Sequence, residues 1–224
     1  MNKYYKAYEQ RYKQSYNLGS LWETKEITLE LAKVMEKYNI SKGMSILEVG
    51  CGEGRDAIHL LDNGYNLVAL DYSKSAINKI NELTNNKYKD NFIQLDIIED
   101  SLDKKYDFIY SIAVLHMFVL EEDRNKYWNF IKKHLNKNGL ACIMCMGDGI
   151  KEYKSNINDA FKLYKKTNIN TKKEILVANT SCKIVNWETL KKEISRNNLE
   201  IIDYYISKDI PNFDKVMCVI IKND

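Results

Sequence analysis

The feature that most constrains this 224-residue chain is an alternation of apolar runs and glycines over residues 45–77. A short apolar run at residues 46–49 leads into the loop Gly50-Cys51-Gly52-Glu53-Gly54, after which the apolar residues take a helical spacing. A second apolar run ends on Asp71, 21 residues after the first glycine of the loop. This order predicts a β-α-β unit with a carboxylate at the tip of its second strand.

Glycines in such a loop allow a ligand to lie directly against the backbone. Glycine has no Cβ, so the chain turns with positive φ, and the following helix offers unpaired N–H groups at its start. An acid at the end of the neighbouring strand, here Asp71, is placed to accept two hydrogen bonds from a ribose diol. The unit therefore predicts a site for a nucleoside.

The glycine spacing separates two classes of nucleoside-binding protein. The dinucleotide fingerprint is G-x-G-x-x-G, whereas the spacing here is G-x-G-x-G and Arg55 stands at the place of the third dinucleotide glycine. Preceded by Glu48, the loop resembles the first motif of the class I methyltransferases, which bind S-adenosylmethionine. An NAD-dependent oxidoreductase is the first alternative, and a non-catalytic module that binds S-adenosylmethionine is the second.

The resemblance implies a role for each matching residue. The glycine loop would approach the methionine part of the cofactor, Glu48 its amino group and Asp71 its ribose, while Asp96 would accept a hydrogen bond from the adenine amino group. Trp22 would cover the cofactor or, alternatively, anchor the core, and Asp96 could instead cap a turn. The expected cofactor site comprises Trp22, Glu48, Gly50, Cys51, Gly52, Gly54, Asp71, Tyr72, Asp96, Ile97, Ser111 and Ile112.

A long β-rich run at residues 105–115 continues into His116-Met117-Phe118. It looks like the fourth-strand motif of small-molecule methyltransferases, particularly the tellurite-resistance type and its thiopurine-methylating relatives. The prolines that mark nucleobase-methylating enzymes, by the same resemblance, are absent after this run. We therefore expect a small-molecule acceptor, whose nucleophile is sulfur, oxygen, nitrogen or a chalcogen oxyanion.

Two residues are candidates for chemistry at the acceptor. Methyl transfer is an in-line displacement that depends on alignment in a water-poor pocket, so no dedicated nucleophile or metal is required. His116 is the predicted base for an acceptor that must lose a proton, or else it orients a loop by hydrogen bonding. Arg55 is predicted to bind an anionic acceptor or a cofactor carboxylate, or to pair with Asp56 or Glu53.

The element order, read with this resemblance, predicts an α/β fold. We expect a Rossmann-like, doubly wound, mostly parallel seven-stranded sheet with an antiparallel last strand and helices on both faces. Residues 1–224 form one expected domain, with residues 1–40 as an N-terminal helical lid or cap and residues 147–186 as an insertion over the active face. The first segment carries tyrosines spaced for one helical face, at Tyr4, Tyr5, Tyr8, Tyr12 and Tyr16.

Several boundaries follow from local signals. Apolar spacing predicts helices over residues 23–38 and 121–136, a strand over residues 140–146, and a short helix over residues 157–164. Ser73 and Asn186 are predicted N-caps.

Composition limits the partners. A net charge of +3, from 34 basic and 31 acidic residues, gives no strong field for nucleic acid or a membrane surface. No apolar segment approaches the ~20 residues that span a bilayer, and the polar start lacks the centre of a signal peptide. We expect a cytoplasmic monomer or homodimer. Cys142 and Cys145 should face opposite sides of a strand, so we expect no metal site.

Overall fold

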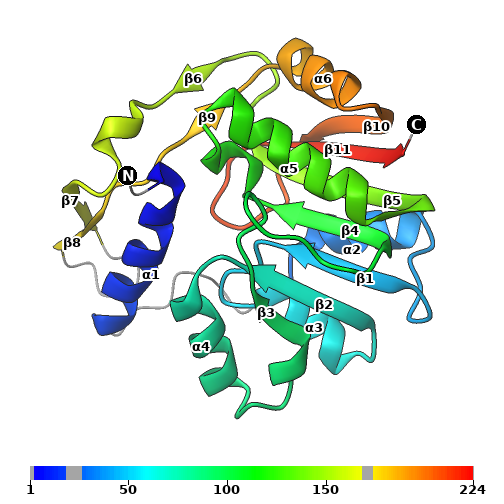
Figure 1. The fold of residues 1–224 in the computed structure, drawn as a ribbon, viewed down its shortest axis with the longest axis horizontal. Coiled ribbons are helices and arrows are strands. Elements are labelled where there is room, and N and C mark those ends of the chain that lie inside the picture. Colours follow the sequence, from blue (N-terminus) through cyan, green and yellow to red (C-terminus); the bar gives the residue numbers. More distant parts are fainter. Residues whose placement is uncertain (1–2, 19–26, 168–173, 224) are drawn as a thin grey trace.

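The protein is built around a seven-stranded sheet (Figure 1). The computed structural model describes residues 3–18, 27–167 and 174–223. In chain order the sheet strands are β1 (Ser45–Val49), β2 (Asn66–Asp71), β3 (Phe92–Gln94), β4 (Tyr106–Ile112), β5 (Leu135–Met146), β10 (Leu199–Ser207) and β11 (Val216–Asn223). Their spatial order is β10-β11-β5-β4-β1-β2-β3. The first five run parallel, while β11 runs antiparallel to both β5 and β10, which confirms the expected fold class.

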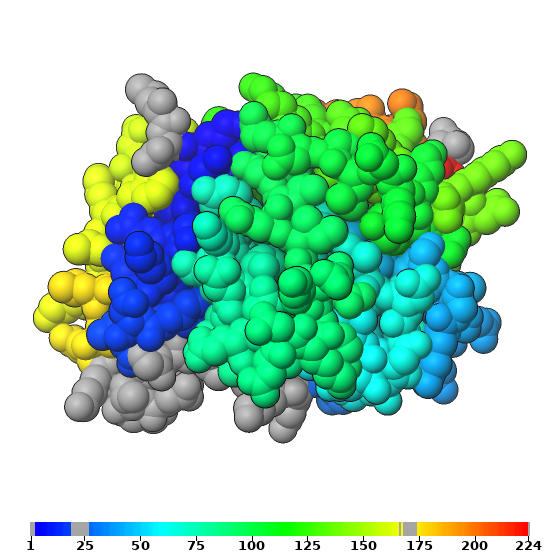
Figure 2. All heavy atoms as spheres, turned by 60° about the horizontal axis from the view of Figure 1, so that its bottom comes forward, coloured from blue at the N-terminus to red at the C-terminus, as the bar shows by residue number. Residues whose placement is uncertain are grey.

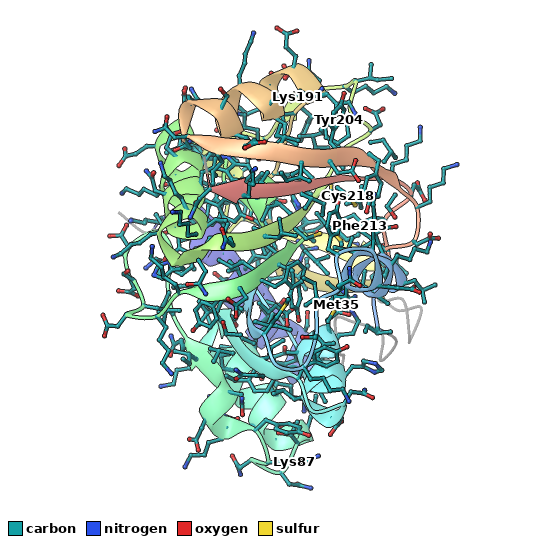
Figure 3. The ribbon with its side chains drawn as sticks, turned by 90° about the vertical axis from the view of Figure 1, so that its right-hand side faces the viewer. Met35, Lys87, Lys191, Tyr204, Phe213 and Cys218 are labelled. Atoms are coloured by element: carbon teal, nitrogen blue, oxygen red, sulfur yellow. The ribbon has the colours of Figure 1, made fainter. Side chains whose placement is uncertain are left out.

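Helices cover both faces of this sheet. Apolar residues of α2 (Leu29–Lys37), α3 (Arg55–Asp62) and α4 (Lys74–Leu83) join one core, and those of α5 (Glu121–His134) and α6 (Trp187–Arg196) join the other. Because successive strand residues point to opposite sides, Ile46 packs in the first core and its neighbour Leu47 in the second. Cys142 and Cys145 separate in the same way, as their spacing predicts. Lys191 of α6 lies over the ring of Tyr204 on β10, with its Nζ 3.5 Å from the ring centroid (Figure 3).

The tyrosine-rich N-terminal segment is helical, as expected, and its Tyr4 and Tyr5 join the same core as α5 and α6. A 3-10 turn at Tyr4–Lys6 leads into α1 (Ala7–Asn17), which lies on the side toward which the parallel strands point (Figure 1). Beside it stands the antiparallel pair β7 (Leu163–Thr167) and β8 (Glu174–Ala178). Figure 2 shows α1, in blue, between this pair, in yellow, and the blue-green residues of α4. The short strands β6 (Tyr153–Lys154) and β9 (Lys183–Ile184) also pair.

Hydrogen bonds tie α1 to both of its neighbours. The Gln14 side-chain oxygen accepts from the backbone N–H of Ala178 at 2.6 Å. On the other side the Glu9 carboxylate accepts from the hydroxyls of Ser73, at 2.6 Å, and Ser75, at 2.8 Å. The helix thus joins the segment that follows β5 to the start of α4.

The predicted N-caps are confirmed. The Ser73 hydroxyl accepts from the backbone N–H of Ala76 at 3.0 Å, and the Asn186 side-chain oxygen accepts from that of Thr189 at 2.9 Å. Each bond satisfies an N–H that has no partner within the first turn of its helix.

Several of the predicted boundaries differ from those in the structure. The helix expected to reach residue 136 ends at His134, and β5 begins at once, because Leu135 pairs with Tyr106 of β4 and the Asn136 side chain donates to Asp107 at 2.7 Å. The short helix expected over residues 157–164 is only a 3-10 turn at Ile157–Asp159, and Tyr164 lies on β7, opposite Val177. Among the described residues α2 begins at Leu29, and residues 19–26, which include Trp22, lie outside them.

None of the helices in the described part of the chain combines the length and the apolar composition that crossing a membrane requires.

Candidate active site

A cavity of about 490 Å³ lies at the carboxyl ends of the parallel strands, within the size range of small-ligand sites. One part of its lining comes from the strand ends, namely Gly50 after β1, residues 70–72 at the end of β2 and residues 95–97 after β3. Residues 112–114 and 116–118 follow from β4. The other part of the lining comes from α1, from residues 180 and 182 before β9, and from residues 211–213 between β10 and β11.

Gly50 lets two segments of the cavity wall lie in close contact. Its φ is +78°, and a Cβ at this position would lie 2.2 Å from Cγ2 of Val114. The backbone N–H groups of Gly50 and Cys51 both donate to the carbonyl of Leu70, at 2.8 and 2.9 Å. Only glycine allows the loop after β1 to lie this close to the segment after β4 without strain.

Asp71 links this loop to the end of β2. One carboxylate oxygen accepts from the backbone N–H of Gly52 at 2.8 Å, and the other accepts from that of Ser73 at 2.7 Å. Burial, reinforced by the nearby Glu9, raises the pKa of Asp71 to about 6, although the two amide bonds act in the opposite direction. Each oxygen of an ionised carboxylate accepts about two hydrogen bonds, so Asp71 retains acceptor capacity toward the cavity that it lines.

The N-terminal segment closes over the neighbouring acid, Asp96. The Tyr5 hydroxyl donates to this carboxylate at 3.1 Å, the backbone N–H of Ile98 donates at 3.2 Å, and the Lys6 ammonium lies 3.4 Å away. The Tyr5 ring also meets the ring of Tyr72 edge-on, with the centroids 6.2 Å apart. These contacts place aromatic side chains beside both acids.

His116 lies in a tight turn after β4. Ala113 begins the turn with a φ of 58°, and a 3-10 turn at Leu115–Met117 follows. His116 is 5% exposed, and its Nδ1 has no hydrogen-bond partner among the described residues. Burial, with a smaller contribution from the nearby Arg124, lowers the pKa of His116 to about 4. The imidazole that lines the cavity is therefore neutral at pH 7.

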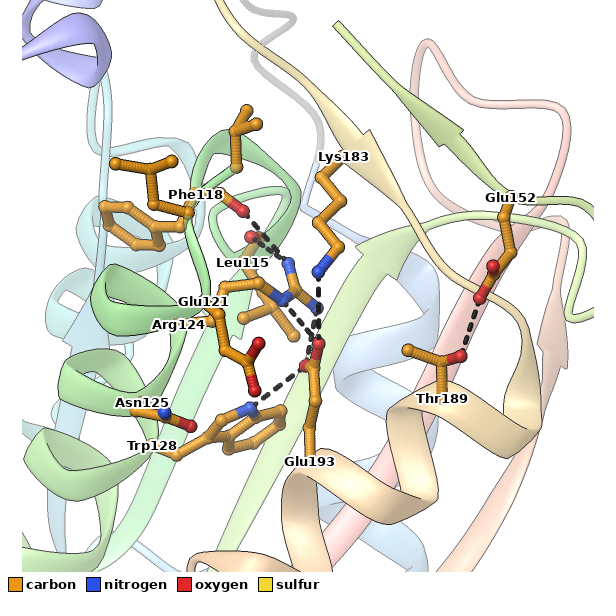
Figure 4. A network of polar contacts seen from close by, with 12 residues as sticks. Leu115, Phe118, Glu121, Arg124, Asn125, Trp128, Glu152, Lys183, Thr189 and Glu193 are labelled. Atoms are coloured by element: carbon orange, nitrogen blue, oxygen red, sulfur yellow. Dashed lines mark hydrogen bonds and ion pairs between the residues drawn. The ribbon is translucent and has the colours of Figure 1, made fainter. Parts of the chain in front are cut away.

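A buried ion pair fixes the backbone on both sides of His116 (Figure 4). The Arg124 guanidinium donates to the carbonyls of Leu115, at 2.9 Å, and Phe118, at 3.2 Å. Its other nitrogens form two bonds of 2.7 Å to the carboxylate of Glu193 on α6. These two side chains are 1% and 2% exposed, so the pair is fully desolvated. The network connects α5, α6 and the cavity turn.

The cavity brings together only part of the predicted site. Glu48 is buried and accepts from the Tyr110 hydroxyl at 2.9 Å without lining the cavity. Ser111 is fully buried and also stands outside the lining, as do Cys51, Gly52 and Gly54. The predicted residues that line it are Gly50, Arg55, Asp71, Tyr72, Asp96, Ile97, Ile112 and His116.

Arg55 takes part in an ion pair at the cavity edge. Its guanidinium lies 2.9 Å from the carboxylate of Asp56 and donates to the Thr28 hydroxyl at 2.8 Å. Pairing with Asp56 is one alternative that the sequence predicted for Arg55, and binding of an anion is another.

Sequence reasoning missed a second arginine, Arg11, which lines the cavity from α1. The signal was present, because Tyr8, Arg11 and Tyr12 share one face of a helix. Thr180 and Cys182 lie in the insertion predicted over the active face but were not singled out, and residues 211–213 were missed because they reach the cavity only through long-range packing.

A family model described as "Methyltransferase domain" matches residues 47–141. The ubiquinone biosynthesis O-methyltransferase of Rickettsia typhi is 30% identical over 138 residues, which cover 60% of this chain and 55% of that protein. The EEF1A lysine methyltransferase 2 of Danio rerio is 37% identical over 83 residues, covering 37% of this chain and 34% of that protein. The chain spans about half the length of the curated O-methyltransferases that it matches.

Among solved structures, the 1,6-didemethyltoxoflavin-N1-methyltransferase of Burkholderia thailandensis, with bound 1,6-didemethyltoxoflavin and S-adenosylhomocysteine, matches with a TM-score of 0.72. The match has 15% identity and covers 99% of this chain and 89% of that chain. The chain has a methyltransferase fold. In this methyltransferase fold the cavity lies where open α/β sheets bind ligands, outside the carboxyl ends of the strands.

Proposed function

We propose that the protein transfers a methyl group from S-adenosylmethionine to a small-molecule acceptor inside this cavity. One observation carries the proposal: a single cavity joins a nucleoside-type wall, with Gly50 and Asp71, to a second wall formed by α1 and the segment that precedes β9. The first wall suits the cofactor, and the second provides room and side chains for an acceptor.

The described residues fit this cofactor. Asp71 lines the cavity with acceptor capacity for a ribose diol, and Leu70, Leu95 and Ile97 add apolar surface for a base. Asp96 offers a carboxylate to the adenine amino group, which would share it with the Tyr5 hydroxyl. We keep Glu48, Cys51, Gly52, Gly54 and Ser111 in the proposal as residues that support this site without lining the cavity. Trp22 lies outside the described residues, and its role in covering the cofactor rests on the sequence alone.

A dinucleotide fits less well. It would place a pyrophosphate over the first turn of α3, where helix N–H groups attract anions. Arg55 stands where the dinucleotide fingerprint has its third glycine, and its side chain pairs with the buried Asp56 at 2.9 Å across this turn. We therefore favour S-adenosylmethionine over NAD.

The bound cofactor would supply a methyl group that is activated by a positively charged sulfur. Asp71 and Asp96 would hold its nucleoside part, and its sulfur would take up the carbon–sulfur electron pair when the methyl group passes to an acceptor lone pair. The chain's own contribution is to align the two molecules and exclude water, for which Tyr5, Tyr8 and Tyr12 form one wall. His116 lines the cavity and remains the proposed base for a hydroxyl acceptor, with a lowered pKa that makes it a weaker base than a free imidazole.

The acceptor atom is a further proposal. The O-methyltransferase names of the curated relatives favour oxygen. The resemblance of residues 106–118 to the tellurite-resistance and thiopurine type favours sulfur or a chalcogen oxyanion instead. A wall of α1 side chains over the cavity favours a small molecule in either case. In this proposal residues 1–40 act as a lid or cap and residues 147–186 as an insertion over the active face.

Calorimetry and a transfer assay test the proposal. We expect micromolar binding of S-adenosylhomocysteine, no binding of NAD, and transfer of labelled methyl to at least one member of a panel of phenols, thiols, amines and selenite. Binding of NAD without S-adenosylhomocysteine would refute the proposal in favour of an oxidoreductase. Tight binding of S-adenosylhomocysteine with no transfer across the panel would favour a module that senses the cofactor.

A further inference from the structure

The acceptor wall of the cavity contains a buried cation. Arg11 lines the cavity from α1 and is 9% exposed. One terminal nitrogen of its guanidinium donates to the Thr180 hydroxyl at 2.6 Å, and the other donates to the Tyr164 hydroxyl at 2.7 Å. Burial lowers the pKa of Arg11. An arginine stays protonated despite such a shift.

The two hydroxyls orient the guanidinium. Their bonds fix the plane of the guanidinium fork. The Tyr164 ring reinforces this orientation, since its centroid lies 5.7 Å from the Arg11 Cζ. A planar fork that is held in place matches the geometry of a carboxylate better than a flexible ammonium does.

The groups around Arg11 favour an anion on an apolar body. Burial raises the pKa of Tyr8 to about 12, so that its hydroxyl stays protonated and neutral at pH 7. Tyr12, Met146 and Phe213 line the same cavity and offer aromatic and apolar surface. Attraction between opposite charges is stronger here than in water because the effective dielectric constant of a buried site is lower.

We infer that Arg11 binds a carboxylate of the methyl acceptor, which makes the substrate a small aromatic or apolar acid with its nucleophilic atom elsewhere on the molecule. This inference rests on the proposed function. Arg11 is held by Tyr164 and Thr180, which belong to the β7–β9 segment, whereas the nucleoside-type wall is built from the ends of β1, β2 and β3. The carboxylate is therefore assigned to the acceptor and not to the methionine part of the cofactor.

The test measures binding to the protein saturated with S-adenosylhomocysteine. The probes are 4-hydroxybenzoate, 3,4-dihydroxybenzoate, phenylacetate and indole-3-acetate, each compared with its neutral amide by calorimetry. We expect at least one acid to bind and its amide to bind at least about 10-fold more weakly. Arg11→Gln should weaken binding of that acid by about 10- to 100-fold, since it removes a charge-assisted pair.

Two further variants serve as controls. Arg11→Lys keeps the charge without the planar fork, so it should lose less affinity for the acid than Arg11→Gln does. This variant keeps the inference testable if Arg11→Gln fails to fold. Lys13→Gln removes an exposed charge from the same helix and should leave acid binding unchanged. Affinity for S-adenosylhomocysteine should stay within about twofold of the parent protein in all three variants.

Several outcomes would overturn the inference. They are equal binding of acids and amides, unchanged acid binding in Arg11→Gln, or no binding by any acid of the panel. If Arg11→Gln weakens binding of S-adenosylhomocysteine but not of 5′-methylthioadenosine, which lacks the carboxylate, then Arg11 binds the cofactor carboxylate and the inference is wrong. Failure of the parent protein to bind S-adenosylhomocysteine would instead refute the proposed function.

Discussion

Glu193→Gln tests how strongly the buried ion pair stabilises the fold. The substitution keeps the size of the side chain but leaves the Arg124 charge desolvated beside two carbonyls and a neutral amide. Removing one partner of a buried pair costs about 3–5 kcal/mol, because the remaining charge loses its compensation. For a domain of this size each kcal/mol lowers Tm by about 2–4 °C. The expected loss is therefore about 6–20 °C.

Thermal and urea unfolding measure this loss, with a matched control on the same helix. Glu188 is exposed and forms a surface pair with Lys192 at 2.6 Å, so Glu188→Gln should cost less than about 1 kcal/mol. The double variant Arg124→Met with Glu193→Leu removes the ion pair but leaves the carbonyls of Leu115 and Phe118 without this donor, so it should recover only part of the stability that Glu193→Gln loses.

The same substitution should disturb the cavity, because Arg124 holds the carbonyls on both sides of His116. We expect Glu193→Gln to lower turnover at temperatures where the protein is still folded. A loss of stability below about 1 kcal/mol would refute this account of the pair. So would a double variant that is as unstable as Glu193→Gln.

Three further substitutions address the cavity directly. Asp71→Ala should weaken binding of S-adenosylhomocysteine by about 1.5–3 kcal/mol, measured by calorimetry. Because protonation removes a hydrogen-bond acceptor and the pKa of Asp71 is about 6, the affinity of the parent protein should fall as the pH drops through this value, whereas the affinity of the variant should not change. A parent affinity that does not depend on pH would argue against this role of Asp71. Gly50→Ala should lower urea stability by at least about 1–2 kcal/mol because of its positive φ and the contact with Val114, whereas Gly43→Ala, with nothing within 4 Å, should change little. His116→Ala should reduce turnover of a phenol more than of a thiol in a methyl-transfer assay, and equal losses would assign it to structure.

The sequence predicted the parts of the fold that depend on neighbours along the chain. The β-α-β unit was predictable because an apolar run, a glycine loop and a helical spacing follow one another within residues 45–77. The Ser73 and Asn186 caps were predictable for the same reason, since each hydroxyl or amide meets an N–H three residues later. The acid that ends β2 was also placed correctly at the cavity.

The missed features depend on residues that are far apart in sequence. β5 starts at Leu135 because of its pairing with Tyr106, which no local pattern reveals. Arg124 and Glu193 are 69 positions apart, and the local sequence around each one predicts only an exposed charge on a helix. Tyr164 lies on a strand because of its partner Val177, and only that strand brings its hydroxyl to Arg11.

The two hydrogen bonds that Asp71 accepts from Gly52 and Ser73 affect how this wall binds a nucleoside. Because the carboxylate already tethers the glycine loop before any nucleoside arrives, little backbone freedom remains to be lost there on binding. Affinity at this wall should therefore respond weakly to loop-stiffening changes and strongly to changes in the carboxylate itself. This side of the binding site is therefore preorganised by folding, and a bound nucleoside must fit its shape.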